Sequence, residues 1–240
     1  MVKKKTKIKK RKPTPASNKK DVLKLVSYEI TEEPMIDEVY ESLPETIQDE
    51  LKDIHGKIHG PIHKDSDRIV SRLEELVKQY PHVPQISNYL AAAYNLTGSN
   101  KFEQCVEDNY KKHPDYLFAR VHYAGQCMDN NDLEKIPEIF KVGYDLKVLY
   151  PNRNRFHISE FIAFNALMCR YFDSTGKRHA AEVMLKSLEK IAPEHPATKQ
   201  AKRCMQGSLL DKLLTKIKQV TSNNEPLQST DEDKPSSFEA

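Results

Sequence analysis

Apolar residues recur at helical spacing over most of the chain. In residues 45–59 they form one stripe of isoleucine and leucine: Ile47, Leu51, Ile54 and Ile58. A single stripe of this kind predicts an amphipathic helix that buries one face. Pro44 suits the first turn of this helix, and Ser42 is its expected cap. The dipeptide Gly60-Pro61 predicts where the helix ends.

A shorter apolar set lies just before this helix. Its members are Met35, Ile36, Val39, Tyr40 and Leu43. Their spacing predicts a short amphipathic helix with Pro34 in its first turn.

From residue 87 onward the same order of residue types appears three times. Each copy has a small residue, then a bulky or sulfur-bearing one, then a turn. The small residues are Ala91, Ala124 and Cys169, and the turn residues are Gly98, Asn131 and Gly176. The first two small residues are 33 positions apart and the next two are 45 apart, because a loop around LYPNRNRFHIS is inserted. A period in the low thirties built of two helices predicts a solenoid.

This pattern resembles the tetratricopeptide repeat (TPR) family over about residues 45–206. The small residues stand where the two helices of that repeat cross closely. Pro81, Pro114 and Pro193 follow second helices, as the terminal proline of the family does. The resemblance implies an all-α fold, a TPR-like helical-hairpin solenoid. The chain departs from the family because it has no Trp, and because Pro137 should delay or kink one second helix.

Composition divides the chain into four parts. Residues 1–20 are expected to be a disordered basic arm, because they carry many lysines and few apolar groups. Residues 21–60 form an acidic helical segment, residues 61–220 the TPR-like repeat domain with a C-terminal capping helix, and residues 221–240 a disordered tail. The apolar stripe of the capping helix, at 209–220, also suits a membrane-surface or partner helix.

The sequence predicts neither a membrane span nor a secretory signal, since no apolar run is long enough. Its four cysteines, with no C-x-x-C pair, are typical of reduced intracellular thiols in small core positions. We expect a cytoplasmic protein, or a nuclear one if the source is eukaryotic.

The segment HGKIHGPIH sets three histidines four residues apart: His55, His59 and His63. Two histidines at this spacing share a helix face, but zinc needs a third protein ligand. That ligand would have to come from beyond the helix break, at His63, Asp65 or Asp67. We therefore expect no metal site, and histidines whose protonated form the helix dipole favours.

The sequence carries none of the common catalytic motifs. It has no G-x-S-x-G, no P-loop and no glycine-rich dinucleotide turn, with seven glycines in all. We expect no enzyme and no cofactor.

In TPR proteins the first helices line a concave groove that holds an extended peptide or a partner's helix. Transferred by repeat position, the resemblance places five residues at this groove: Asn88, Asn95, Phe118, His122 and Arg170. The asparagines suit this role because an amide bonds a peptide backbone through both donor and acceptor. The alternative is that these asparagines are ordinary solvated helix residues with no role in binding. The lysine and asparagine clamp by which some co-chaperones of the family hold a C-terminal carboxylate is absent.

The inserted loop offers a second candidate surface. It carries Arg153, Arg155, Phe156 and His157. Two guanidinium groups beside an aromatic ring suit an acidic or phosphorylated partner, although many such insertions are only tolerated.

The basic arm suggests a function of another class. Its cationic residues include Lys3, Lys4, Lys5, Lys9, Lys10 and Arg11. Such residues displace counterions from nucleic-acid phosphates, but the arm has no aromatic ring to stack on bases. A nuclear-localisation signal and a tail resting on the acidic segment are further interpretations.

The sequence thus favours a non-enzymatic adaptor or chaperone-like module that binds another protein. A nucleic-acid- or ribosome-associated protein is the alternative, and the oligomeric state stays open.

Overall fold

The structure, a computed structural model, describes residues 28–34, 37–60, 65–141 and 143–207. The basic arm, the capping helix at 208–220, the tail and His63 lie outside the described residues. What the sequence indicates for these parts stays a prediction.

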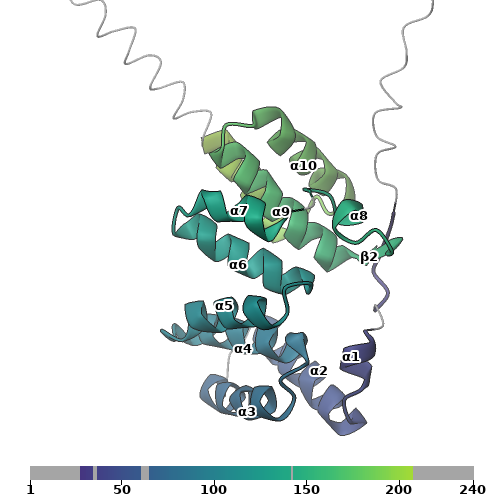
Figure 1. The fold of residues 1–240 in the computed structure, drawn as a ribbon, viewed down its shortest axis with the longest axis vertical. Helices are drawn as coiled ribbons and strands as arrows, with labels where there is room; N and C mark the ends of the chain where they lie inside the picture. The colour runs from purple at the N-terminus through teal and green to yellow at the C-terminus, as the bar shows by residue number, and fades with distance from the viewer. Residues whose placement is uncertain (1–27, 35–36, 61–64, 142, 208–240) are drawn as a thin grey trace, which may run out of the picture.

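The described chain is mostly helical, and consecutive helices pack on one another (Figure 1). After α1 (Glu38–Glu41) and α2 (Glu45–His59) come α3 (Ser66–Gln79), α4 (Pro84–Thr97), α5 (Phe102–Lys112) and α6 (Leu117–Asp129). The 3₁₀ helix η2 (Leu133–Lys135), α7 (Ile136–Ile139), α8 (Leu146–Leu149), α9 (Ile158–Ser174) and α10 (Arg178–Ile191) follow, and residues 196–207 are also helical. Helix α4 packs between α2 and α6, and α6 packs in turn on α9.

The predicted stripe of α2 is confirmed, since Leu51, Ile54 and Ile58 are buried. The helix ends at His59 and Gly60 is its C-cap, as expected. The predicted cap was wrong. Pro44 takes the cap position without a side-chain hydrogen bond, and the Ser42 hydroxyl donates instead to the carbonyl of Val39 in the preceding turn.

Three helices end two residues before a proline, as the sequence predicted. Helices α3, α5 and α10 precede Pro81, Pro114 and Pro193. In each case the residue before the proline adopts φ between −126° and −142° and ψ of 61° to 62°. A following proline disfavours the helical region for this residue, so the helix stops there.

The three predicted turn residues all adopt the left-handed conformation. Their φ angles are 63° at Gly98, 61° at Asn131 and 74° at Gly176. Glycine has no Cβ penalty in this region, and asparagine tolerates it better than most residues. These turns reverse the chain between a first helix and the helix that follows it.

Small side chains allow the helices to approach closely at the positions where the repeat placed them. Ala91, Ala124 and Cys169 are buried, and so is Ala181 in the second helix of the last pair. The buried apolar residues form two clusters, one over residues 43–94 and one over residues 117–205. The described residues therefore form two cores in series.

The helix expected to follow α6 is broken. Pro137 lies in the first turn of α7, which ends at Ile139, and the chain becomes helical again only at α8. Helix α8 also ends two residues before a proline, Pro151. Pro137 occupies a first-turn position, where proline is tolerated because that amide hydrogen has no partner within the helix, so it does not account for the break after Ile139.

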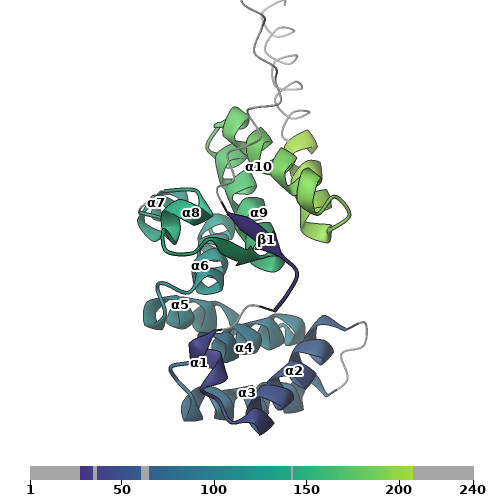
Figure 2. The same ribbon diagram turned by 90° about the vertical axis from the view of Figure 1, so that its right-hand side faces the viewer.

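The mostly helical fold agrees with the all-α prediction, and a short two-stranded parallel sheet that the sequence did not predict is added to it. Strand β1 (Glu29–Thr31) pairs with β2 (Arg155–His157), in the register Glu29 to Arg155. The acidic segment is thus partly a strand and not only helical. In Figure 2 strand β1 lies in front of α9. Asp37, the N-cap of α1, accepts a hydrogen bond from Gln85 of α4.

We expect overpacking of the second core to destabilise the fold. Ala124 is 0% exposed, so Ala124→Leu should lower the free energy of unfolding by about 1–3 kcal/mol. The neighbouring Gly125→Ala should raise it by about 0.5–1 kcal/mol, because a Cβ there meets nothing within 4 Å. Urea denaturation of both variants checks this. An Ala124→Leu protein as stable as the parent would show that this crossing is not close-packed.

Candidate functional site

A cavity of about 430 Å³ lies where α4, α6, α9 and the helical residues 196–207 meet. Its floor is made largely of the smallest side chains: Ala91, Ala92, Gly125, Ala163, Ala166, Ala197 and Ala201. Small residues on neighbouring helices leave this volume between them because their side chains end near the backbone. The cavity is therefore formed jointly by α4, α6, α9 and the helical segment that follows α10.

Three of the predicted groove residues line this cavity: Asn95, His122 and Arg170. Asn95 and His122 are exposed at its surface. Arg170 is engaged, since its guanidinium donates to the Asp129 carboxylate at 2.7 Å. These three residues thus share one cavity, their role in binding stays a prediction, and the sequence did not reveal that Arg170 is paired.

The two other predicted groove residues lie outside the cavity lining. Asn88 precedes Ala92 by one turn of α4, and its Oδ1 is buried with no hydrogen-bond partner among the described residues. Phe118 packs between Tyr116 and His122, with ring centroids 5.8 Å and 6.3 Å apart. The structure does not bring these two residues into the same hollow.

His122 projects into the concavity, where surrounding helices reduce its contact with bulk water. This burial lowers the pKa of His122, although part of the ring remains exposed. A histidine with a lowered pKa is neutral at neutral pH. The imidazole therefore offers one donor and one acceptor there, not a positive charge.

Sequence reasoning missed five polar residues of the lining: Glu103, Gln126, Asp129, Asn130 and Gln200. The Oε1 atom of Gln126 is buried without a hydrogen-bond partner in the described part of the chain. The Glu103 side chain, in the first turn of α5, is exposed and makes no hydrogen bond or ion pair within that part. Gln126 lies one turn after His122, so helical spacing from that histidine was the signal that could have found it.

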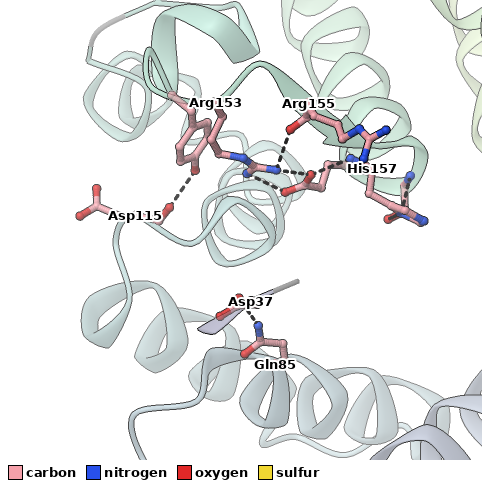
Figure 3. Close-up of polar contacts among 9 residues, drawn as sticks. Asp37, Gln85, Asp115, Arg153, Arg155 and His157 are labelled. Atoms are coloured by element: carbon pink, nitrogen blue, oxygen red, sulfur yellow. Dashed lines mark hydrogen bonds and ion pairs between the residues drawn. The ribbon is translucent and has the colours of Figure 1, made fainter. Parts of the chain in front are cut away.

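The inserted loop is not a free binding surface, which corrects the second sequence prediction. Phe156 is 0% exposed and packs edge-on against Tyr28 at 4.9 Å. The Arg153 guanidinium bonds Glu160 at 2.7 and 3.0 Å and lies 4.3 Å from the Phe156 ring centroid. In Figure 3 dashed lines mark the contacts of the Arg153 guanidinium.

The other two loop residues also hold the fold together. Arg155 reaches across the sheet to Glu29 at 3.2 Å and to Glu33 at 3.5 Å. His157 is the N-cap of α9, where its side chain accepts the amide hydrogen of Ser159. Its own amide donates to Glu160, which completes a capping box (Figure 3). These side chains therefore anchor the sheet and start α9.

His55, on α2, differs from the prediction. The rings of His55 and His59 are 4.4 Å apart, and Tyr89 lies 5.5 Å from His55. Burial, and then the neighbouring His59, lower the pKa of His55, so the protonated form is not favoured. Within the described ranges, no three histidine, cysteine, aspartate or glutamate side chains are grouped to hold a metal ion.

The cysteines are core residues with one exception. Cys127 and Cys169 are buried and Cys105 is half-buried, whereas Cys204 is exposed. Burial raises the pKa of Cys105 and of Cys169 to about 11, which keeps both thiols protonated and unreactive. Among the helices that the structure describes, none is long and apolar enough to cross a membrane.

We expect the loop residues to matter for stability. Phe156→Ala should cost about 3–5 kcal/mol, because it empties a fully buried ring position. The matched change Arg155→Ala removes only surface ion pairs and should cost about 1 kcal/mol or less. Denaturant titration of the two variants compares them. Equal, small losses would show that β2 does not anchor the second core.

Acid should weaken the fold through its histidines. Burial lowers the pKa of His55, His113 and His122 below the value of about 6.5 that each has in the unfolded state. The unfolded state therefore binds more protons below that pH, and the free energy of unfolding falls as the pH is lowered from about 7 to about 5. We expect the His122→Gln protein to lose less of its free energy of unfolding between these pH values, because it lacks one of these three histidines.

His179→Gln is the matched control, because His179 lies on α10 outside the cavity lining. Unfolding curves at several pH values provide the measurement. A His122→Gln protein that loses as much stability in acid as the His179→Gln protein would contradict this prediction.

Comparison with known proteins finds no relative of this chain. No family model, no curated protein and no solved structure matches it. Its function is therefore inferred from the residues and the geometry described above.

Proposed function

We propose that this chain is a non-enzymatic adaptor or chaperone-like module, a TPR-like helical solenoid that binds a segment of another protein in its concave cavity. The observation that carries this proposal is the cavity of about 430 Å³ whose floor of alanine and glycine is contributed by α4, α6, α9 and residues 196–207. A hollow formed across successive helices suits a partner that runs along them.

The order of packing supports a repeat of this type. Helices α4, α6 and α9 follow one another as inner helices, while α5, α7 and α10 follow them as second helices. Small buried residues recur at Ala91, Ala124 and Cys169, one in each inner helix. Repeat solenoids use the surface of their successive units as an extended binding face.

The chemistry of the lining suits hydrogen bonding to a peptide. Half of its eight polar or charged side chains are amides, at Asn95, Gln126, Asn130 and Gln200, and the others are Glu103, His122, Asp129 and Arg170. Amides donate and accept hydrogen bonds but do not transfer protons near neutral pH. The one thiol exposed among the described residues, Cys204, does not line the cavity.

Filling the cavity should abolish partner capture without unfolding the protein. Gln200→Trp and Asn95→Trp place a large ring at exposed lining positions, so they should reduce capture about tenfold or more and leave the thermal melt almost unchanged. Partners are captured from the source cell with the tagged full-length protein, identified by mass spectrometry and titrated against each variant.

The matched control is Val183→Trp, at a position on α10 that is 46% exposed and outside the cavity lining. It should leave capture intact. If the Gln200→Trp and Asn95→Trp proteins both still capture the partner, the binding surface lies elsewhere and the proposal is contradicted.

A further inference from the structure

The part of the chain that follows the described residues begins close to the cavity. The helical segment 196–207 contributes Gln200 and Ala201 to the cavity lining, and Gly207 is its last described residue. Gly207 lies six positions after Ala201, which is about 9 Å further along a helix. The chain beyond Gly207 therefore starts within about two helical turns of the cavity.

The sequence of that part contains an amphipathic pattern with no assigned partner. Residues 209–220 read LLDKLLTKIKQV. Wound as a helix, their six aliphatic side chains share one face about 140° wide. They are Leu209, Leu210, Leu213, Leu214, Ile217 and Val220. Lys216 and Lys218 border this leucine-rich face, and Thr215 lies opposite it. A helix this short is stable in water only when its apolar face packs on another surface.

The cavity offers such a surface. Ten of its lining residues are alanine, glycine, valine, leucine or phenylalanine, and seven of those ten are alanine or glycine. Where two helical surfaces meet, large side chains of one occupy the space that small side chains of the other leave. The leucine-rich face of residues 209–220 matches the alanine and glycine floor contributed by α4, α6 and α9 in this way.

The charges agree with this match. The lining carries Glu103 and Asp129 against Arg170, whereas residues 209–220 carry three lysines against Asp211. The two surfaces thus have opposite net charge. Complementary charge favours the correct orientation of docking more than it adds affinity, so we count it as secondary to the apolar contact.

A second apolar surface, on α10, is less suitable. Val183 and Ile191 are 46% and 36% exposed there. Lys186 and Lys190 are also exposed, and helical spacing places them beside these two residues. They would lie against the lysines of residues 209–220, and like charges brought together disfavour docking.

We propose that residues 209–220 fold back as a helix after Gly207, place their leucine-rich face in the cavity and compete there with the partner segment. The inference rests on the proposed function only for this competition. A short linker gives a tethered segment an effective concentration of order 1 mM, so a dissociation constant of about 0.1 mM already fills the cavity about nine-tenths of the time. A competing partner then binds about tenfold more weakly.

Tryptophan fluorescence tests the docking directly in the full-length protein. The chain contains no tryptophan, so a single substitution introduces a unique fluorophore. Leu213→Trp places it on the leucine-rich face, and the matched Thr215→Trp places it on the opposite face. We expect acrylamide to quench the Leu213→Trp protein less than the Thr215→Trp protein, and its emission to lie at shorter wavelength, because only the first indole is buried.

A second substitution in the Leu213→Trp protein identifies the docking surface. Asn95 is an exposed residue of the cavity lining on α4. Asn95→Arg should raise the quenching to the level of the Thr215→Trp protein, because it places a bulky cation where the leucine-rich face would lie. The matched Val183→Arg, on α10, should leave the indole shielded. Thermal melts verify that each protein is folded.

Three fluorescence results would overturn the inference. Equal quenching of the Leu213→Trp and Thr215→Trp proteins would show that the segment is not docked. Exposure of the indole by Val183→Arg and not by Asn95→Arg would place the segment on α10. Shielding that disappears on dilution, together with a dimer that dissociates in sedimentation equilibrium, would show that the occupant comes from a second copy of the chain.

The competition has its own measurement. Leu213→Asp should tighten capture of a cellular partner about tenfold by freeing the cavity, and Thr215→Asp should not. Unchanged capture by the Leu213→Asp protein would overturn the competition. The fluorescence measurements need no partner, so they decide the docking even if the proposed function fails.

Discussion

The close approach of neighbouring helices at small side chains is the constraint on which the rest of this structure depends. Ala124 and Cys169 are buried within α6 and α9, so the backbones of these inner helices can lie near their neighbours. Alanine and glycine also line the faces of α4, α6 and α9 that border the cavity. Their small side chains leave that volume unfilled. One packing rule thus produces both the stability of the stack and its candidate binding site.

The pairing of strand β1, near the N-terminus, with strand β2, in the inserted loop, also holds this stack of helices together. The protein has two apolar cores in series, and residues 28–43 contribute to both, with Tyr28 and Ile30 at the second core and Leu43 in the first. Asp37 bonds Gln85 of α4 at 2.5 Å, while Arg155 holds the other end of the segment through Glu29 (Figure 3). Residues distant in sequence therefore fix the ends of the same short segment.

Local signals in the sequence predicted much of the helical part. Prolines ended helices at the expected places, and Gly98, Asn131 and Gly176 formed the expected left-handed turns, because each depends on its immediate neighbours.

The sheet could not be predicted in this way. Its strands are three residues long, too short for a periodic pattern, and they pair across about 126 positions of sequence. The exposed role expected of Phe156 failed for the same reason, since only this distant pairing buries its ring. Within the cavity, repeat position found Asn95 and His122, whereas the pairing of Arg170 with Asp129 depends on two helices and was not visible.

The central claim, that the inner face and not the inserted loop binds a partner, can be tested by site-specific photocrosslinking in the source cell. A photoreactive amino acid is placed at Asn130, which lines the cavity, or at Asn152, which is exposed in the loop. The account predicts a discrete crosslinked partner from position 130 and none from position 152. A partner crosslinked only from position 152 would contradict it.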